Sequence, residues 1–121
     1  MSEMSGIRLL VCGGRDFHNT DFVHNTLCDL HHRNPIAVVI HGAATGADYE
    51  GMIWAQMMDI KHLPVVADWH RHGKAAGPLR NQRMLDEGKP DLVLAFPGGK
   101  GTADMVLRAK LAGITTIETK P

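Results

Sequence analysis

Residues 91–112 of the chain read D-L-V-L-A-F-P-G-G-K-G-T-A-D-M-V-L-R-A-K-L-A. The stretch opens with an apolar run, Asp91–Ala95, that does not alternate with polar residues and is typical of a strand buried on both faces. A glycine-rich turn follows at Phe96–Thr102. The residues after the turn are apolar at helical spacing, namely Met105, Val106, Ala109 and Ala112. The stretch therefore predicts a strand, a tight turn and a helix, which is the repeating unit of a parallel α/β sheet.

Four further apolar runs precede and follow this unit. They are Ile7–Cys12, Ile36–Ile40, Leu63–Ala67 and Ile114–Glu118. Three more segments have helical spacing, marked by Phe22, Leu27 and Leu30, by Ile53, Met57 and Ile60, and by Leu79, Arg83 and Met84. The alternation of strand and helix predicts an α/β fold, a single Rossmann-like domain over residues 1–121 with a doubly wound, mostly parallel five-stranded sheet. Ligands of such sheets bind beyond the carboxyl ends of the strands.

Residues that favour helix starts support three of the predicted helices. The segment 45–48 reads T-G-A-D and has the form of a capping box, so we expect the second helix to open there. Gly77 and Pro78 place a proline at a first helical position, where its missing N–H costs nothing. Thr102 is a hydroxyl N-cap candidate for the last helix, with Asp104 in the first turn to suit the helix dipole.

The composition is that of one globular domain. The chain has 121 residues, of which 44% are apolar and 21% charged, and no apolar run approaches the length of a membrane span. The first residues, M-S-E-M-S-G-I-R, lack the layout of a signal peptide. Two cysteines in such a chain fit reduced thiols, and Cys12, at the end of a buried run, fits a packed thiol better than a nucleophile. We expect a cytoplasmic protein without membrane association.

The charge balance bears on the partner. The net charge is zero and aromatic residues make up 5%, so nucleic-acid binding, which needs positive charge and stacking platforms, is disfavoured. Nine of the 13 Lys and Arg residues lie between residues 69 and 121, in the half that holds the glycine-rich turn. An anionic small ligand is compatible with that distribution. The eight histidines include the pairs His31 and His32, and His70 and His72, but no Cys or acid cluster completes a site, so we expect neither a metal nor a cofactor.

The turn F-P-G-G-K-G-T at residues 96–102 is the most specific candidate for a binding site. Glycines at 98, 99 and 101 let the backbone approach a ligand, and the free N–H groups of the helix start attract an anion. The alternative is a tight turn that merely needs glycine. The loop H-G-A-A-T-G-A-D at residues 41–48 looks like a weaker copy, and its alternative is close helix–sheet packing by small residues. Arg80 is a candidate for a bond to phosphate, and Trp69 either stacks on a base or caps the core.

Four strand-to-helix loops supply the expected ligand-binding residues. They are Gly13, Gly14 and Arg15; Gly42, Ala43, Gly46 and Asp48; Trp69, Arg80 and Asn81; and Pro97, Gly98, Gly99, Lys100, Gly101 and Thr102.

These motifs together resemble a known family. The turn P-G-G-K-G-T followed by a helix is similar to the motif of the Lonely guy (LOG) phosphoribohydrolases and their SLOG superfamily relatives. The ordered set G-G-R-D-F, H-G-A-A-T-G-A-D, A-D-W, G-K-A-A-G-P-L-R-N and F-P-G-G-K-G-T resembles the YspA-type, cpYpsA-related branch over residues 7–118. The resemblance implies a Rossmann-like sheet, a nucleotide or nucleotide-derived ligand, a dimer or larger assembly, and either ligand sensing or cleavage of an N-glycosidic bond.

Carried over residue by residue, the resemblance makes Arg80 the arginine of the LOG site and residues 98–102 its phosphate turn. The LOG motif continues with an acid where this chain has Met105, which can neither accept nor donate a proton. Asp104 is adjacent, but one step along a helix turns a side chain by about 100°. Replacement acids could stand at the loop ends, at Asp16, Asp48 or Asp68. The candidate catalytic residues are therefore Arg80, Asp104, Asp16 and Asp48.

Two functions follow as hypotheses. The first is a module that binds a nucleotide or ADP-ribose-like ligand in order to sense or sequester it. The alternative is a phosphoribohydrolase, or related N-glycoside hydrolase, that acts on a nucleoside monophosphate. Self-association is expected in either case, because an open sheet leaves edges and helical faces to cover.

Overall fold

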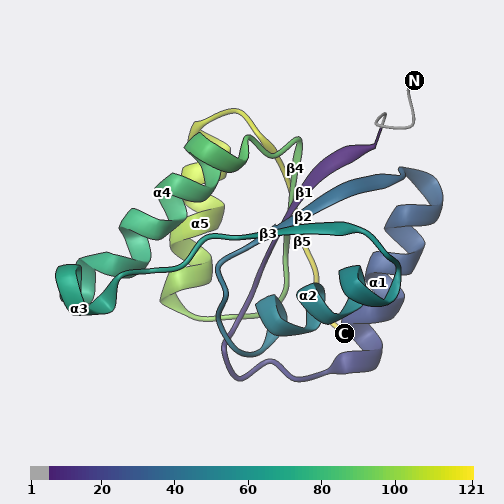
Figure 1. Cartoon of the computed structure of the whole chain (residues 1–121), viewed down its shortest axis with the longest axis horizontal. Helices are drawn as coiled ribbons and strands as arrows, with labels where there is room; N and C mark the ends of the chain where they lie inside the picture. The colour runs from purple at the N-terminus through teal and green to yellow at the C-terminus, as the bar shows by residue number, and fades with distance from the viewer. Residues whose placement is uncertain (1–5) are drawn as a thin grey trace.

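The computed structural model describes residues 6–121 as five strands and the helices that connect them (Figure 1). The expected domain start at residue 1 lies outside the described residues, and so do residues 1–5 of the segment that lacks a signal-peptide layout. In chain order the elements are β1 Ile7–Cys12, α1 Thr20–Arg33, β2 Ile36–His41, α2 Ala47–Met57, β3 Lys61–Pro64, α3 Trp69–His72, the short 3₁₀ helix η1 Gly73–Ala75, α4 Ala76–Gly88, β4 Leu92–Ala95, α5 Lys100–Leu111 and β5 Thr115–Glu118.

The strands form one parallel sheet in the order β3-β2-β1-β4-β5. The central strand β1 places Leu9 opposite Val39 of β2 and opposite Leu92 of β4. The chain runs outward from β1 in both directions, so the strand order reverses between β1 and β4. This confirms the predicted doubly wound sheet, and it locates the crevice in which such folds bind ligands.

Helices cover both faces of the sheet (Figure 1). Leu9 and Val11 of β1 pack with α1 and α2, whereas Leu10 and Cys12 point to the opposite face and pack with α4 and α5. The two-residue period of a strand produces this division, and it explains why the strand sequences read as continuous apolar runs. Among the described residues, no helix combines the length and the apolar character that a membrane span requires.

The third strand lies earlier than predicted. It was expected at Leu63–Ala67, but β3 spans Lys61–Pro64. Its neighbour β2 ends at His41, which is paired with Pro64, so the chain beyond that point has no strand to pair with. One further bond remains, from Val65 N–H to the carbonyl of His41. The apolar residues 65–67 therefore continue into a loop, with Val65 buried and Val66 exposed.

The predicted apolar stripe of the second helix is wrong. Helix α2 ends at Met57, so Ile60 lies outside it, and Met57 itself is 69% exposed. Besides Trp54 and the acids Asp48 and Glu50, the buried residues of α2 are small, because α2 packs closely on β1. A methyl on Gly51 would already come within 3.1 Å of Val11 Cγ1. Small residues carry little hydrophobic signal, which is why the pattern pointed to the wrong face.

The other three stripes are largely confirmed, although Arg83 is exposed and two further residues are misplaced. Leu27, Leu30, Met84, Met105, Val106 and Ala109 are buried, and Phe22 is partly buried. Leu79 is almost half exposed, and Ala112 follows the end of α5.

All three predicted helix starts need correction. Gly46, and not Thr45, is the N-cap of α2, and the Thr45 hydroxyl instead donates to the carbonyl of Arg15. Helix α4 begins two residues before Pro78, which still lies in the first turn where no backbone donor is required. Helix α5 begins at Lys100 with Gly99 as N-cap, so Thr102 lies inside the helix.

Candidate functional site

A cavity lies at the carboxyl ends of β1 and β4, beside the starts of α2, α4 and α5. Its volume is about 490 Å³, within the usual range of small-molecule sites. Twelve of the sequence-predicted residues line it: Gly13, Gly14, Arg15, Asp48, Trp69, Arg80, Asn81, Gly99, Lys100, Gly101, Thr102 and Asp104. Loops from four separate parts of the chain thus meet in one cavity.

The remaining predicted residues lie elsewhere. Gly42, Ala43 and Gly46 do not line the cavity, and neither do Asp16 and Asp68. Pro97 and Gly98 line a neighbouring hollow of about 220 Å³, which shares Gly99 and Thr102 with the main cavity. Asp16 is exposed, and Asp68 caps α3 by accepting the N–H of Arg71.

Helix α5 begins at the cavity with free backbone donors. Gly99 is its N-cap and provides no side-chain cap, and the first helical bond runs from Ala103 N–H to the carbonyl of Gly99. The N–H groups of residues 100–102 therefore have no intrahelical acceptor, and they lie at the positive end of the helix dipole.

The glycines of this turn differ in the space available beside the Cα atom. A methyl on Gly98 would come within 2.6 Å of the backbone nitrogen of Gly14, so internal packing requires glycine there. A methyl on Gly99 or Gly101 would meet no atom within 4 Å. Gly101 even sits in a helix, where glycine is less favourable than alanine by up to about 1 kcal/mol. The space beside these two glycines is open to a ligand.

The backbone donors of the loop after β2 are bonded to a carboxylate of this chain, that of Asp48. Asp48, 5% exposed, accepts the N–H of Gly42 at 2.8 Å and the N–H of Ala44. Burial raises the pKa of the Asp48 carboxyl, while these two bonds, Arg80 and Arg15 lower it. Gly46, two residues before Asp48, has φ +75, and a methyl there would reach the carbonyl oxygens of Gly14 and Arg15. This loop resembles a phosphate cradle whose donors are taken up by the chain's own carboxylate.

Arg80 faces Asp48 across Gly42. Its Nη1 donates to the carbonyl of Gly42 at 2.6 Å, and its Nε donates to Asn81 Oδ1 at 3.2 Å. Burial lowers the pKa of the guanidinium, Asp48 raises it, and Arg15 lowers it. Among residues 6–121, no side chain or carbonyl accepts from Nη2. That nitrogen is therefore available to a ligand in the cavity.

Trp69 lines the cavity and does not cap the core. Helix α3, which begins at Trp69, has no buried residue and lies at the periphery of the molecule (Figure 1). The indole is 47% exposed, and Arg15 Cζ lies 4.9 Å from the centre of its ring. The cavity thus has one flat aromatic wall.

Sequence reasoning missed six lining residues: Cys12, Ala44, Lys74, Gly77, Pro78 and Met84. Lys74 matters most, since it brings the cationic lining residues to four, with Arg15, Arg80 and Lys100, against the acids Asp48 and Asp104. Its position in the motif G-K-A-A-G-P-L-R-N was the available signal. Burial raises the pKa of Cys12, so it stands at the cavity as a neutral thiol.

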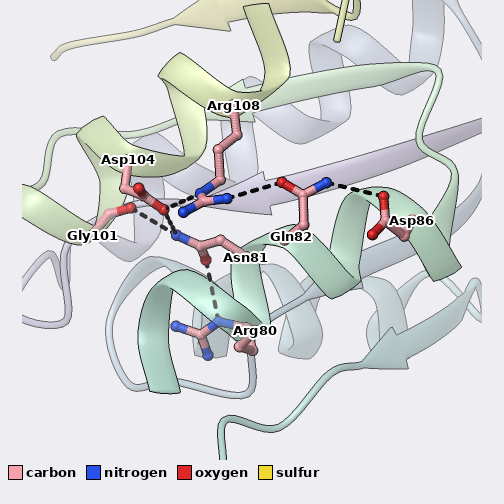
Figure 2. A network of polar contacts seen from close by, with 7 residues as sticks. All are labelled: Arg80, Asn81, Gln82, Asp86, Gly101, Asp104 and Arg108. Carbon is pink, nitrogen blue, oxygen red and sulfur yellow. Dashed lines mark hydrogen bonds and ion pairs between the residues drawn. The ribbon is translucent and has the colours of Figure 1, made fainter. Parts of the chain in front are cut away.

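The two residues of α5 that follow the LOG-like motif point in different directions. Met105 is fully buried and packs with Cys12 and Met84 beneath the cavity. Asp104 lines the cavity, but its Oδ2 accepts both Asn81 Nδ2 at 2.9 Å and Arg108 Nε at 2.8 Å (Figure 2). The carboxylate of Asp104 is therefore engaged in tying α4 to α5. Within residues 6–121, no group of three His, Cys, Asp or Glu side chains could hold a metal ion.

Fold and cavity together define a small Rossmann-like domain with a cavity at the switch point of its sheet. The chain belongs to the YspA, cpYpsA-related SLOG family, whose model matches residues 7–72. The Gene 61 protein of Mycobacterium phage D29 is 41% identical over 118 residues, covering 91% of this chain and 94% of the relative. The family resemblance expected from the motifs is thereby confirmed.

A solved structure supports the fold. The DNA processing protein A (DprA) of Streptococcus pneumoniae superposes with a TM-score of 0.54 at 16% identity, over 94% of this chain. This chain spans 59% of that structure. At this level of identity the likeness concerns the Rossmann-like architecture alone.

Proposed function

We propose that this protein binds a nucleotide or a nucleotide-derived ligand of the ADP-ribose type and acts as a sensor or sequestering module. The observation that carries the proposal is the set of groups that line the 490 Å³ cavity. It combines an uncapped helix start, four cationic side chains and one exposed aromatic ring. An anionic group and a flat base in one molecule complement these features.

The phosphate is assigned to the start of α5. The free N–H groups of residues 100–102 and the helix dipole favour an anion, and Gly99 and Gly101 leave room for it. Lys100 and the free Nη2 of Arg80 add positive charge from two sides. The loop at Gly42 is not assigned a phosphate, because Asp48 already accepts its donors.

The base is assigned to Trp69. Stacking of a base on an aromatic ring contributes about 1–3 kcal/mol. A micromolar complex needs about 8 kcal/mol in all, and a helix start supplies at most about 2 kcal/mol. Phosphate, arginine and base contacts are therefore all required.

Isothermal titration calorimetry with AMP, GMP, ADP and ADP-ribose tests the proposal, with adenosine as the phosphate-free control. We expect at least one nucleotide to bind in the micromolar range and adenosine to bind at least tenfold more weakly. Arg33→Ala, an exposed substitution on α1 far from the cavity loops, should leave the affinity unchanged. The lack of any heat or thermal shift with every nucleotide would overturn the proposal.

A specific observation favours hydrolysis as a second candidate. Of the three loop aspartates that could replace the missing acid, only Asp48 lines the cavity, and burial raises its pKa. In this reaction the Asp48 carboxylate would take a proton from water as the water adds to the ribose carbon. The proton would pass to the base as the glycosidic bond breaks, which returns Asp48 to its carboxylate form. Release of free base from AMP, GMP, NAD or a cytokinin nucleotide, with loss of the release in Asp48→Asn, would support hydrolysis. No release from any of these compounds would exclude hydrolysis and leave ligand binding as the function.

We also propose that two copies associate. Leu107 and Leu111 on α5 are 58% and 79% exposed, and Ile117 on the edge strand β5 is 39% exposed. Light scattering after gel filtration should give at least a dimer, weakened by Leu111→Lys, and a monomer at all concentrations would contradict this.

Both cysteines are free thiols, which suits a reducing compartment, and we accordingly assign ligand binding to the cytoplasm.

A further inference from the structure

Asn81 is a buried polar residue with every amide atom in use. It is 4% exposed and lies in the second turn of α4. Its Oδ1 accepts Arg80 Nε at 3.2 Å, and its Nδ2 donates to the carbonyl of Gly101 at 3.1 Å and to Asp104 Oδ2 at 2.9 Å (Figure 2). Both N–H bonds of the amide are thus directed to the protein and not to the cavity.

The partners determine which way the amide faces. The side of Asn81 toward Arg80 meets a donor, and the side toward α5 meets two oxygen acceptors. Only a primary amide offers an acceptor and two donors at this size. An aspartate would oppose the Asp104 carboxylate and the Gly101 carbonyl, and an aliphatic side chain would leave several polar groups without partners.

These bonds join the two anion-binding elements of the site. Arg80 is held at two points, by Asn81 through Nε and by Gly42 through Nη1, which leaves Nη2 for a ligand. The same Asn81 amide holds Gly101, in the turn whose N–H groups are free. One side chain, that of Asn81, therefore links the guanidinium directly to the first turn of α5.

A second connection between α4 and α5 does not have this effect. Arg108 Nη1 donates to Gln82 Oε1 at 2.9 Å, and Gln82 Nε2 donates to Asp86 Oδ1 at 3.0 Å (Figure 2). This branch leads away from Arg80 and the cavity, so Gln82 is a matched control for Asn81 on the same helix.

We propose that Asn81 is a positioning residue that holds Arg80 and the first turn of α5 together as one receptor for a phosphate or pyrophosphate group. The inference rests on the proposed function of the cavity and assigns to Asn81 a role exercised through its neighbours. It implies that a positive charge at position 80 is not enough for tight binding of the phosphate group. The guanidinium must also be held through its Nε.

Calorimetry with inorganic pyrophosphate and with ADP-ribose tests the coupling in the full chain. We expect Asn81→Ala to weaken binding 5–20-fold, and Arg80→Lys, which keeps the charge but lacks Nε, to do the same. The double variant should bind no more than twofold more weakly than Arg80→Lys, and Gln82→Ala should stay within twofold of the unsubstituted protein. Independent, multiplying effects of the two substitutions, an undiminished Arg80→Lys, or an equal loss in Gln82→Ala would overturn the proposal.

A readout without ligand separates this inference from the proposed function. In the unsubstituted protein the Arg80 Nε–H should exchange slowly with solvent by ¹H–¹⁵N NMR, and the protection should be lost in Asn81→Ala but kept in Gln82→Ala. If no phosphate compound binds while this pattern holds, the proposed function fails and the positioning of Arg80 stands. If nucleotides bind and the Nε–H exchanges rapidly in the unsubstituted protein, the inference about Asn81 fails. If Asn81→Ala does not fold, the affinity of Arg80→Lys and the exchange rate of the Arg80 Nε–H in the unsubstituted protein still test the positioning of Arg80.

Discussion

The carbonyl oxygen of Gly42 accepts a hydrogen bond from Arg80 Nη1 at 2.6 Å, across 38 residues of sequence. The N–H of the same glycine donates to Asp48 at 2.8 Å. One residue after β2 therefore holds a cation and an anion at the cavity. A methyl on Gly42 would stand 2.6 Å from Arg80 Nη1 and 2.9 Å from Asp48 Oδ2.

Gly42→Ala should consequently displace the guanidinium of Arg80. We expect at least a tenfold loss of nucleotide affinity by calorimetry, which corresponds to about 1.4 kcal/mol. Gly113→Ala, in the turn after α5 and outside the cavity lining, is the control: its φ of +76 strains an alanine, but the methyl meets no atom within 4 Å, so the variant should lose stability and keep its affinity. Unchanged affinity in Gly42→Ala would show that Arg80 is not held against this glycine when ligand binds.

Gly101→Ala should move stability and affinity in opposite directions. The added methyl meets no protein atom, and alanine favours a helix, so the free energy of unfolding should rise by up to about 1 kcal/mol in urea titrations. The same methyl occupies space beside the free N–H groups and should weaken nucleotide binding at least tenfold. Gly98→Ala, which collides with Gly14, should instead lower stability by about 2 kcal/mol. Tight nucleotide binding by Gly101→Ala would contradict the placement of the phosphate.

Trp69 should report the base by fluorescence. The chain has two tryptophans, and the other, Trp54, is 1% exposed in the core and does not line the cavity. Stacking of a base on Trp69 should quench emission as a nucleotide is added, and Trp69→Phe should abolish the change. Trp69→Ala should weaken binding about 5–100-fold, in line with the usual contribution of stacking. Quenching that persists in Trp69→Phe would place the base elsewhere.

His41 should make the protein less stable in weak acid. The ring is 1% exposed, its Nδ1 accepts the N–H of Ala43, and its Nε2 lies 3.0 Å from His62 Nδ1. Burial, and then His62, lower the pKa of His41 to about 4. Since the unfolded chain protonates near pH 6.5, it binds more protons between pH 6.5 and 4, and the free energy of unfolding falls as the pH falls through that window.

His41→Asn keeps an acceptor for Ala43 but does not titrate. Its free energy of unfolding should therefore lose on the order of 2 kcal/mol less between pH 7 and 4 than that of the unsubstituted protein. Urea titrations at several pH values measure this, with the exposed His32→Asn as control. Parallel curves for His41→Asn and the unsubstituted protein would refute the assignment.

The parts of this structure that depend on local sequence could be predicted, and those that depend on distant partners could not. Strands buried on both faces are recognisable as apolar runs in the sequence. The ends of these runs indicate where the loops that line the cavity begin. The limit of β3 depends on where β2 ends, at His41, which no feature of residues 61–67 reveals. The buried face of α2 depends on close packing at Gly51, which hydrophobic spacing does not record.

The same distinction applies to the cavity. The glycine turn at 98–101 could be assigned because its residue types are tied to a helix start. The engagement of Asp48 with its own loop could not, because T-G-A-D reads equally well as a capping box. The role of Asn81 depends on Asp104, 23 residues away, and on where α5 begins. With the start at Lys100, Asp104 faces the cavity and Met105 the core.

The central claim, that a nucleotide places its phosphate at the start of α5, is tested most directly by ¹H–¹⁵N NMR of the labelled protein titrated with AMP and ADP-ribose. We expect the backbone amides of Lys100, Gly101 and Thr102 to shift most, together with the Arg80 Nε–H, while the amides of α1 stay in place. Unmoved amides at residues 100–102 under conditions where calorimetry detects binding, or shifts centred on another face of the domain, would contradict it.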